Sequence, residues 1–262
     1  MGLAAIMLFE TAGMDRAMAA KKNDFSLINN IWKSNSELSA ITLPDITPYL
    51  YVSPSAPKKR LIRRDYSYST NPERKPEYVI KYGSGGNIKK VEENGNVFTY
   101  NFDKKGRLLS YTQSIAGKWN LTGTVTTNDK GLITQQETEQ KSGDHATTKY
   151  QYKGANIIKD TWRPSNTGFW SPTNHVRKYD AGGRLISYRY VRPKTGKAYI
   201  EIQYQYDENG RIVSAVETRD GQEGADMYTL SYDGDGYLTR MSSQHTGSDY
   251  IWYGDFVYED VK

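Results

Sequence analysis

The stretch YQYDENGRI (Tyr204–Ile212) decides the fold because the chain repeats it in altered form. TYNFDKKGRL (Thr99–Leu108) and VRKYDAGGRL (Val176–Leu185) keep the same order: an aromatic residue, Asp, two variable residues, Gly, Arg and an aliphatic residue. The Asp can accept hydrogen bonds from the backbone N–H groups that follow it and so begin a turn. The Gly can adopt the left-handed conformation that reverses a strand. Each copy therefore predicts a β-hairpin.

The copies recur from Tyr66 to the end of the chain. The residue before the Asp position falls successively at Tyr82, Phe102, Thr127, Tyr152, Tyr179, Tyr206, Tyr232 and Tyr258, with gaps of 20 to 27 residues. Ile202 and Tyr204 alternate with Gln203 and Gln205, as expected of a strand with one apolar face. One hairpin cannot bury such a face alone, so neighbouring copies must cover each other. We predict a mainly β protein, an antiparallel meander of consecutive hairpins forming a twisted or curled sheet, with a short N-terminal helix.

The pattern resembles the YD repeats of the RHS family. The matching residues are Phe102-Asp103 with Gly106-Arg107-Leu108, Tyr179-Asp180 with Gly183-Arg184-Leu185, and Tyr206-Asp207 with Gly210-Arg211-Ile212. In large members such hairpins spiral into a shell around a toxin; this chain is too short to enclose a domain in that way. Choline- and glucan-binding repeats are a looser likeness, because their recurring tryptophans are absent here.

The N-terminal part differs from the repeats. GLAAIMLF (Gly2–Phe9) followed by AMAA (Ala17–Ala20) has the order of a bacterial signal peptide, and an ordinary amphipathic helix is the alternative. We divide the chain into a signal peptide or helix (1–19), a helical and Pro-rich segment (20–65) and a YD-like repeat domain (66–262). A processed signal would place the protein in the periplasm or outside the cell.

The amino-acid composition limits how the core can form and which kinds of site the chain can hold. The chain has 22 Tyr but only 6 Phe, so it can form a core if the rings are buried and the hydroxyls are hydrogen-bonded. It has no Cys, which excludes disulfides and thiolate sites. A net charge of +5 permits an acidic partner without demanding one, and we expect no nucleic acid, cofactor or metal.

Glu201, Gln203 and Gln205 occupy the face on which an outer-membrane barrel carries apolar residues, so we do not expect a transmembrane protein.

Two features interrupt the period and are candidate binding sites. The segment WRPSNTGFWSPTN (Trp162–Asn174) could bind a sugar or peptide, or its aromatic residues could instead cover an open end of the sheet. The basic cluster between Lys58 and Arg64 could bind an anionic partner, or it could be a solvated linker. The candidate residues are Trp162, Phe169, Trp170, Lys58, Lys59, Arg60, Arg63 and Arg64.

For function we favour an exported, non-enzymatic binding or scaffold module for a cell-envelope component, such as a glycan, or for a protein partner. A companion or immunity-type partner of an RHS-like secreted toxin is a second hypothesis. A hydrolase is the third, and it requires His245 or His175 to lie within hydrogen-bond reach of a carboxylate in a pocket.

Overall fold

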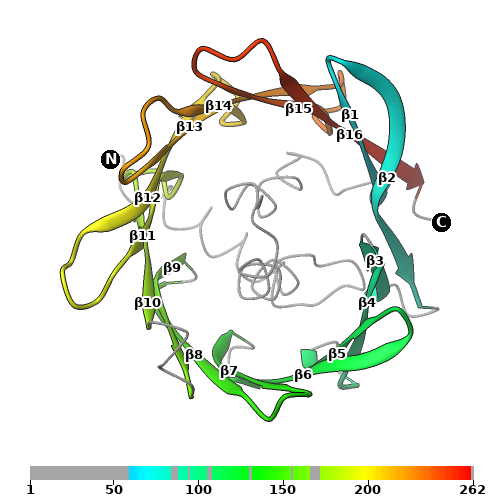
Figure 1. Ribbon diagram of the computed structural model, residues 1–262, viewed down its shortest axis with the longest axis vertical. Helices are drawn as coiled ribbons and strands as arrows, with labels where there is room; N and C mark the ends of the chain where they lie inside the picture. Colours follow the sequence, from blue (N-terminus) through cyan, green and yellow to red (C-terminus); the bar gives the residue numbers. More distant parts are fainter. Residues whose placement is uncertain are drawn as a thin grey trace, which may run out of the picture.

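The computed structural model describes residues 59–83, 88–93, 95–104, 108–129, 132–154, 156–165 and 172–260. These residues form a single antiparallel sheet of sixteen strands, drawn in Figure 1. The strands are β1 (Lys59–Tyr68), β2 (Asn71–Tyr82), β3 (Ile88–Glu93), β4 (Asn96–Phe102), β5 (Leu108–Ile115), β6 (Lys118–Thr127), β7 (Ile133–Gln140), β8 (His145–Lys153), β9 (Asn156–Pro164), β10 (Thr173–Tyr179), β11 (Leu185–Val191), β12 (Ala198–Tyr206), β13 (Ile212–Arg219), β14 (Asp226–Tyr232), β15 (Leu238–His245) and β16 (Ile251–Asp260).

The turn between β12 and β13 explains each position of the repeated motif. Asp207 accepts hydrogen bonds at Oδ1 from the N–H groups of Asn209 (3.0 Å) and Arg211 (2.8 Å). Gly210 has a φ of 76°, in the left-handed region, and its N–H donates to the Asp207 carbonyl. The Arg211 side chain donates to Asp207 Oδ2 (2.7 Å) and lies over the ring of Tyr232 in the next copy. The same turn recurs at Asp180 and, without the Arg, at Asp233.

The tyrosine of each copy bonds to the copy before it. Tyr206 Oη donates to the carbonyl of Leu185 at 2.7 Å, and Tyr232 Oη donates to that of Ile212 at 2.7 Å. The same bond joins Tyr82 to Leu61, Tyr152 to Ile133, Tyr179 to Ile157, and Tyr258 to Leu238. In five of these bonds the aliphatic acceptor ends the preceding motif, whereas Leu61 lies in β1, before the first copy. The excess of Tyr over Phe therefore reflects a hydroxyl that links neighbouring hairpins.

The sheet closes on itself, which corrects the predicted open twisted or curled sheet. β1 pairs antiparallel with β16 over a register that runs from Lys59 opposite Asp260 to Tyr68 opposite Trp252. Figure 1 shows the resulting ring. The open sheet was wrong because no part of the motif marks β1 as a strand, and closure pairs segments some 190 residues apart in sequence. The described residues contain no helix, and the predicted N-terminal helix lies outside them.

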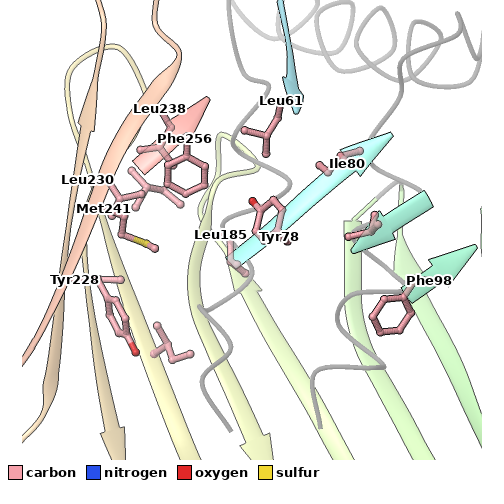
Figure 2. Packing of buried hydrophobic residues seen from close by; sticks show 14 of the residues in the cluster. Leu61, Tyr78, Ile80, Phe98, Leu185, Tyr228, Leu230, Leu238, Met241 and Phe256 are labelled. Atoms are coloured by element: carbon pink, nitrogen blue, oxygen red, sulfur yellow. The ribbon is translucent and has the colours of Figure 1, made fainter. Parts of the chain in front are cut away.

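The inner face of the barrel carries the core. Side chains alternate along each strand: in β4, Phe98 and Tyr100 are buried while Thr99 and Asn101 are exposed. Figure 2 shows buried side chains of different walls directed towards the interior, among them Tyr228, Met241 and Phe98. Further fully buried members are Val91, Tyr111, Ile212, Ala215 and Leu238. The outer face is mainly Thr, Ser, Gln, Glu and Lys, with Gln203 and Gln205 exposed as the alternation predicts.

Alternate turns lie at opposite rims because consecutive strands run in opposite directions. The YD-type turns, including those that begin at Asp180, Asp207 and Asp233, form one rim. The β13–β14 and β15–β16 turns and the β9–β10 connection form the other. We call these the YD rim and the opposite rim. β1 begins at the YD rim, where the backbone N–H of Lys59 donates to Tyr237 Oη.

Candidate binding pocket

A pocket of about 690 Å³ opens at the opposite rim, where the end of β1 lies beside the start of β16. Its lining comes from β1, β13, β14, β15 and β16 and from the two turns that join them. The lining residues are Arg64, Tyr68, Arg219, Gln222, Glu223, Asp226, Tyr228, Ser243, His245, Ser248, Tyr250 and Trp252. Pockets of this size accommodate a small organic ligand or one to two sugar units.

One wall of the pocket is aromatic. The rings of Tyr68 and Tyr250 stack with centroids 5.0 Å apart and an interplanar angle of 28°. Trp252 faces Tyr68 across the β1–β16 pairing. The Trp252 ring lies over Gly254, where an added Cβ would come within 2.6 Å of it. Gly254 therefore lets the indole lie flat against the wall.

Arg64 also lines the pocket and packs against this wall. Its guanidinium forms an ion pair with Glu77 at 2.7 Å and lies 5.5 Å from the ring centre of Trp252 and 5.9 Å from that of Phe256. Burial alone would lower the pKa of Arg64, but the Glu77 carboxylate raises it above its ordinary value. The cation thus stays charged and fixes the position of the indole.

The rest of the lining, from β13 to β15, includes a network of hydrogen-bonded polar groups. His245 Nδ1 lies 3.0 Å from Asp226 Oδ1, directly across the β14–β15 pairing. Arg219 forms two contacts with Glu217 Oε1, at 2.7 Å from Nε and 2.6 Å from the terminal nitrogen, and Tyr228 Oη donates to the second Glu217 oxygen at 3.1 Å. Burial raises the pKa of Glu217, and the nearby Arg219 opposes this rise. Arg219 pairs with Glu217 and lies 3.9 Å from Asp226, so this part of the lining offers both donors and acceptors.

A second polar cluster lies in the inner face of β9 and β10. Asp160 accepts from Arg177 at 2.6 Å and lies 2.6 Å from His175 Nδ1, and all three side chains are buried. The rings of Tyr188 and Tyr190 pack on His175. Burial favours the neutral acid, but the charges of His175 and Arg177 lower the pKa of Asp160 well below its ordinary value. This cluster is a buried ion network in which both carboxylate oxygens of Asp160 have a partner.

The structure separates the predicted site residues. Trp162 is half-buried on the inner face of β9, on the same side as Asp160, while Phe169 and Trp170 lie outside the described residues. Arg63 and Arg64 point to opposite faces of β1 because they are neighbours in a strand. Arg63 contacts Asp65 (2.8 Å), and Lys59 contacts Asp235 (3.6 Å).

Two further members of the basic cluster have no described side chain. Lys58 lies outside the described residues, and Arg60 is described in its backbone alone. Those basic side chains that are described form separate ion pairs.

Sequence reasoning missed the pocket. It named His245 but not Asp226, which lies 19 residues away on the neighbouring strand. Tyr68 and Trp252 are some 180 residues apart and meet only because the barrel closes. The alternation of Tyr250, Trp252 and Gly254 at the start of β16 was the available signal.

The hydrolase hypothesis required a histidine beside a carboxylate in a pocket, and the Asp226–His245 pair meets that requirement. His175 also has a carboxylate partner, but it is buried. No group of three or more His, Asp or Glu side chains suited to a metal ion occurs among the described residues. None of these residues belongs to a helix long and apolar enough to cross a membrane.

No family model and no curated protein matches the chain. Solved structures with similar coordinates include "Crystal Structure of TcdB2-TccC3-Cdc42", with 16% sequence identity and a TM-score of 0.35 over 71% of this chain. The chain spans only 10% of that protein's length. A porin-like protein from Bacteroides vulgatus is 12% identical over 76% of this chain and 100% of the other, with a TM-score of 0.41. Similarity at this level assigns neither a family nor a function.

Proposed function

We propose that the protein is a non-enzymatic binding module that takes a glycan of the bacterial cell envelope into the pocket at the opposite rim. The observation that carries the proposal is that one pocket combines an aromatic wall with hydrogen-bonded polar side chains. Sugars present an apolar C–H face and a ring of hydroxyls, so they fit between an aromatic ring and polar side chains that both donate and accept.

The aromatic wall supplies the stacking surface of this module. Tyr68, Tyr250 and Trp252 are already packed against one another or against Arg64, so little side-chain entropy is lost when a ligand binds. His245, Asp226 and Gln222 line the same pocket and are placed to bond hydroxyl groups. The polar outer face of the barrel agrees with a module that contacts water and binds at its rim.

Titration calorimetry against soluble envelope glycan fragments tests this function. Tyr250→Ala removes one stacking surface, and since Tyr250 is 45% exposed the barrel should remain folded. We expect binding to weaken about 3–10-fold, from a stacking contribution of about 0.5–1.5 kcal/mol. Tyr199→Ala is the matched control, because Tyr199 is also an exposed tyrosine (38%) but does not line the pocket. Equal affinity of the two variants would contradict the proposal.

The Asp226–His245 pair favours a second candidate, a hydrolase acting in the same pocket. Ser243 and Ser248 line that pocket and are the candidate nucleophiles. Turnover of aryl esters that is lost in His245→Ala and retained in Tyr199→Ala would favour this candidate. Binding of a glycan without any turnover would favour the first.

A further inference from the structure

We propose that the sugar bound in this pocket carries a protonated amino group, as a glucosamine unit without its acetyl group does, and that Glu223 and Asp226 receive this group. The selectivity rests on the proposed function, because it names the class of sugar that the same pocket takes. It comes from the charges around the pocket, from the anchoring of the β13–β14 turn and from the aromatic rings of the lining.

The two arginines of the pocket lining each have a carboxylate partner outside the lining. Arg64 pairs with Glu77 at 2.7 Å. Arg219 pairs with Glu217 at 2.6 Å. Burial raises the pKa of Glu93, the Arg64 cation opposes this rise, and the Glu77 carboxylate adds to it. Glu93 is therefore a further carboxylate close to Arg64, and the supporting carboxylates outnumber the two arginines.

Glu223 and Asp226 line the pocket in addition to these supporting carboxylates. Glu223 is exposed and forms no ion pair with any residue that the structure describes. Asp226 lies 3.9 Å from Arg219, which Glu217 binds more closely, and 3.0 Å from His245. With His245 protonated, the described cations around the pocket number three and the carboxylates five. The pocket therefore favours a cationic sugar over an anionic one.

The β13–β14 turn holds Glu223 at the pocket. Gly224 has a φ of 86°, in the left-handed region, and an added Cβ there would lie 3.1 Å from His245 Nε2, so the turn packs closely on β15. The backbone N–H of Thr246 donates to the Ala225 carbonyl at 2.9 Å. The two carboxylates of the lining are thus carried by an anchored segment, and an ammonium group has three donors to share between them.

The aromatic residues favour an amino group near Glu223 and not near Arg64. The Arg64 guanidinium already lies 5.5 Å from the ring centre of Trp252, and it would repel a second cation there. Tyr250 stacks on Tyr68 and is 45% exposed, so a sugar ring can lie against it with its nitrogen directed away from Arg64. An aromatic ring face also attracts a cation.

Two sugars that differ only in their acetyl groups test this selectivity. Titration calorimetry compares a glucosamine trimer with an N-acetylglucosamine trimer at about pH 6, where free amino groups carry a proton. We expect the glucosamine trimer to bind about tenfold more tightly or better, and added salt should weaken its binding alone. Equal affinities, or tighter binding of the acetylated trimer, would overturn the selectivity and leave the proposed function standing. Failure of both trimers to bind would contradict the proposed function as well.

Glu223→Gln removes the carboxylate and keeps the size of the side chain. We expect the preference for the glucosamine trimer over the acetylated trimer to fall about 2–5-fold, because an exposed charge pair contributes modestly to binding. Glu208→Gln is the matched control, since Glu208 is also an exposed glutamate in a turn but lies at the YD rim. The same preference in the two variants would refute the role of Glu223.

A trilysine peptide distinguishes an amino sugar from a cation of another kind. It carries amino groups but lacks the sugar ring that stacks on Tyr250. We expect it to bind the native protein about tenfold more weakly than the glucosamine trimer, and we expect Tyr250→Ala to weaken binding of the trimer but not of the peptide. Peptide binding as tight as that of the trimer would indicate a general cation site and overturn the assignment to an amino sugar.

Discussion

Removing one linking hydroxyl tests how neighbouring hairpins hold together. Tyr206→Phe deletes the donor that lies 2.7 Å from the Leu185 carbonyl and leaves the ring in place. The sequence already shows that the ring alone fits, since Phe102 occupies the same position of another copy. A hydrogen bond of this kind contributes about 0.5–1.5 kcal/mol net, and we expect the free energy of unfolding to fall by about 1 kcal/mol. The melting temperature should fall by about 2–4 °C.

Urea unfolding followed by tryptophan fluorescence measures this change, with Tyr199→Phe as the control on an exposed tyrosine. The control should change stability by less than about 0.5 kcal/mol. Tyr82 makes the same bond to Leu61 in β1 and β2, far along the chain from Tyr206. The double variant Tyr82→Phe with Tyr206→Phe should therefore lose about the sum of the two single losses in the free energy of unfolding. If Tyr206→Phe is as stable as the control, the phenol bonds do not contribute to the cohesion of the repeats.

Three further predictions concern the pocket and the buried cluster. Gly254→Ala should displace the Trp252 indole, because the new Cβ would lie 2.6 Å from it. We expect a shift in tryptophan emission and a weaker affinity for glycan, with a smaller loss in the free energy of unfolding. An unchanged emission spectrum would contradict this. Asp160→Asn should cost about 3–5 kcal/mol in urea unfolding, because it leaves the Arg177 cation buried without its counter-charge, and a loss below 1 kcal/mol would refute the ion network. In the native chain, the lowered pKa of Asp160 contributes stability above the ordinary Asp pKa of about 3.9, and this stability is lost as the pH falls below that value. The urea concentration at the unfolding midpoint should therefore drop between about pH 5 and pH 3. The drop should be smaller in Asp160→Asn.

Features that depend on residues close together in the sequence could be predicted, whereas features that depend on the pairing of distant segments could not. Asp207 and Gly210 specify their turn through atoms within four residues, so the hairpin and its alternating faces could be predicted. Closure depends on β1 pairing with β16 and on the accumulated twist of many strands, and neither has a short motif. The pocket could not be predicted for the same reason, because Tyr68 and Trp252 become neighbours only through that pairing.

The pairing of β1 with β16 also sets the order in which the protein can mature during synthesis. The first wall strand is translated at Lys59–Tyr68, but its partner, Ile251–Asp260, is translated some 190 residues later. Until then the growing sheet has two unpaired edges that can recruit other chains. A nascent chain of this protein is therefore exposed to aggregation until β16 has been translated, and loss of β16 would make that exposure permanent.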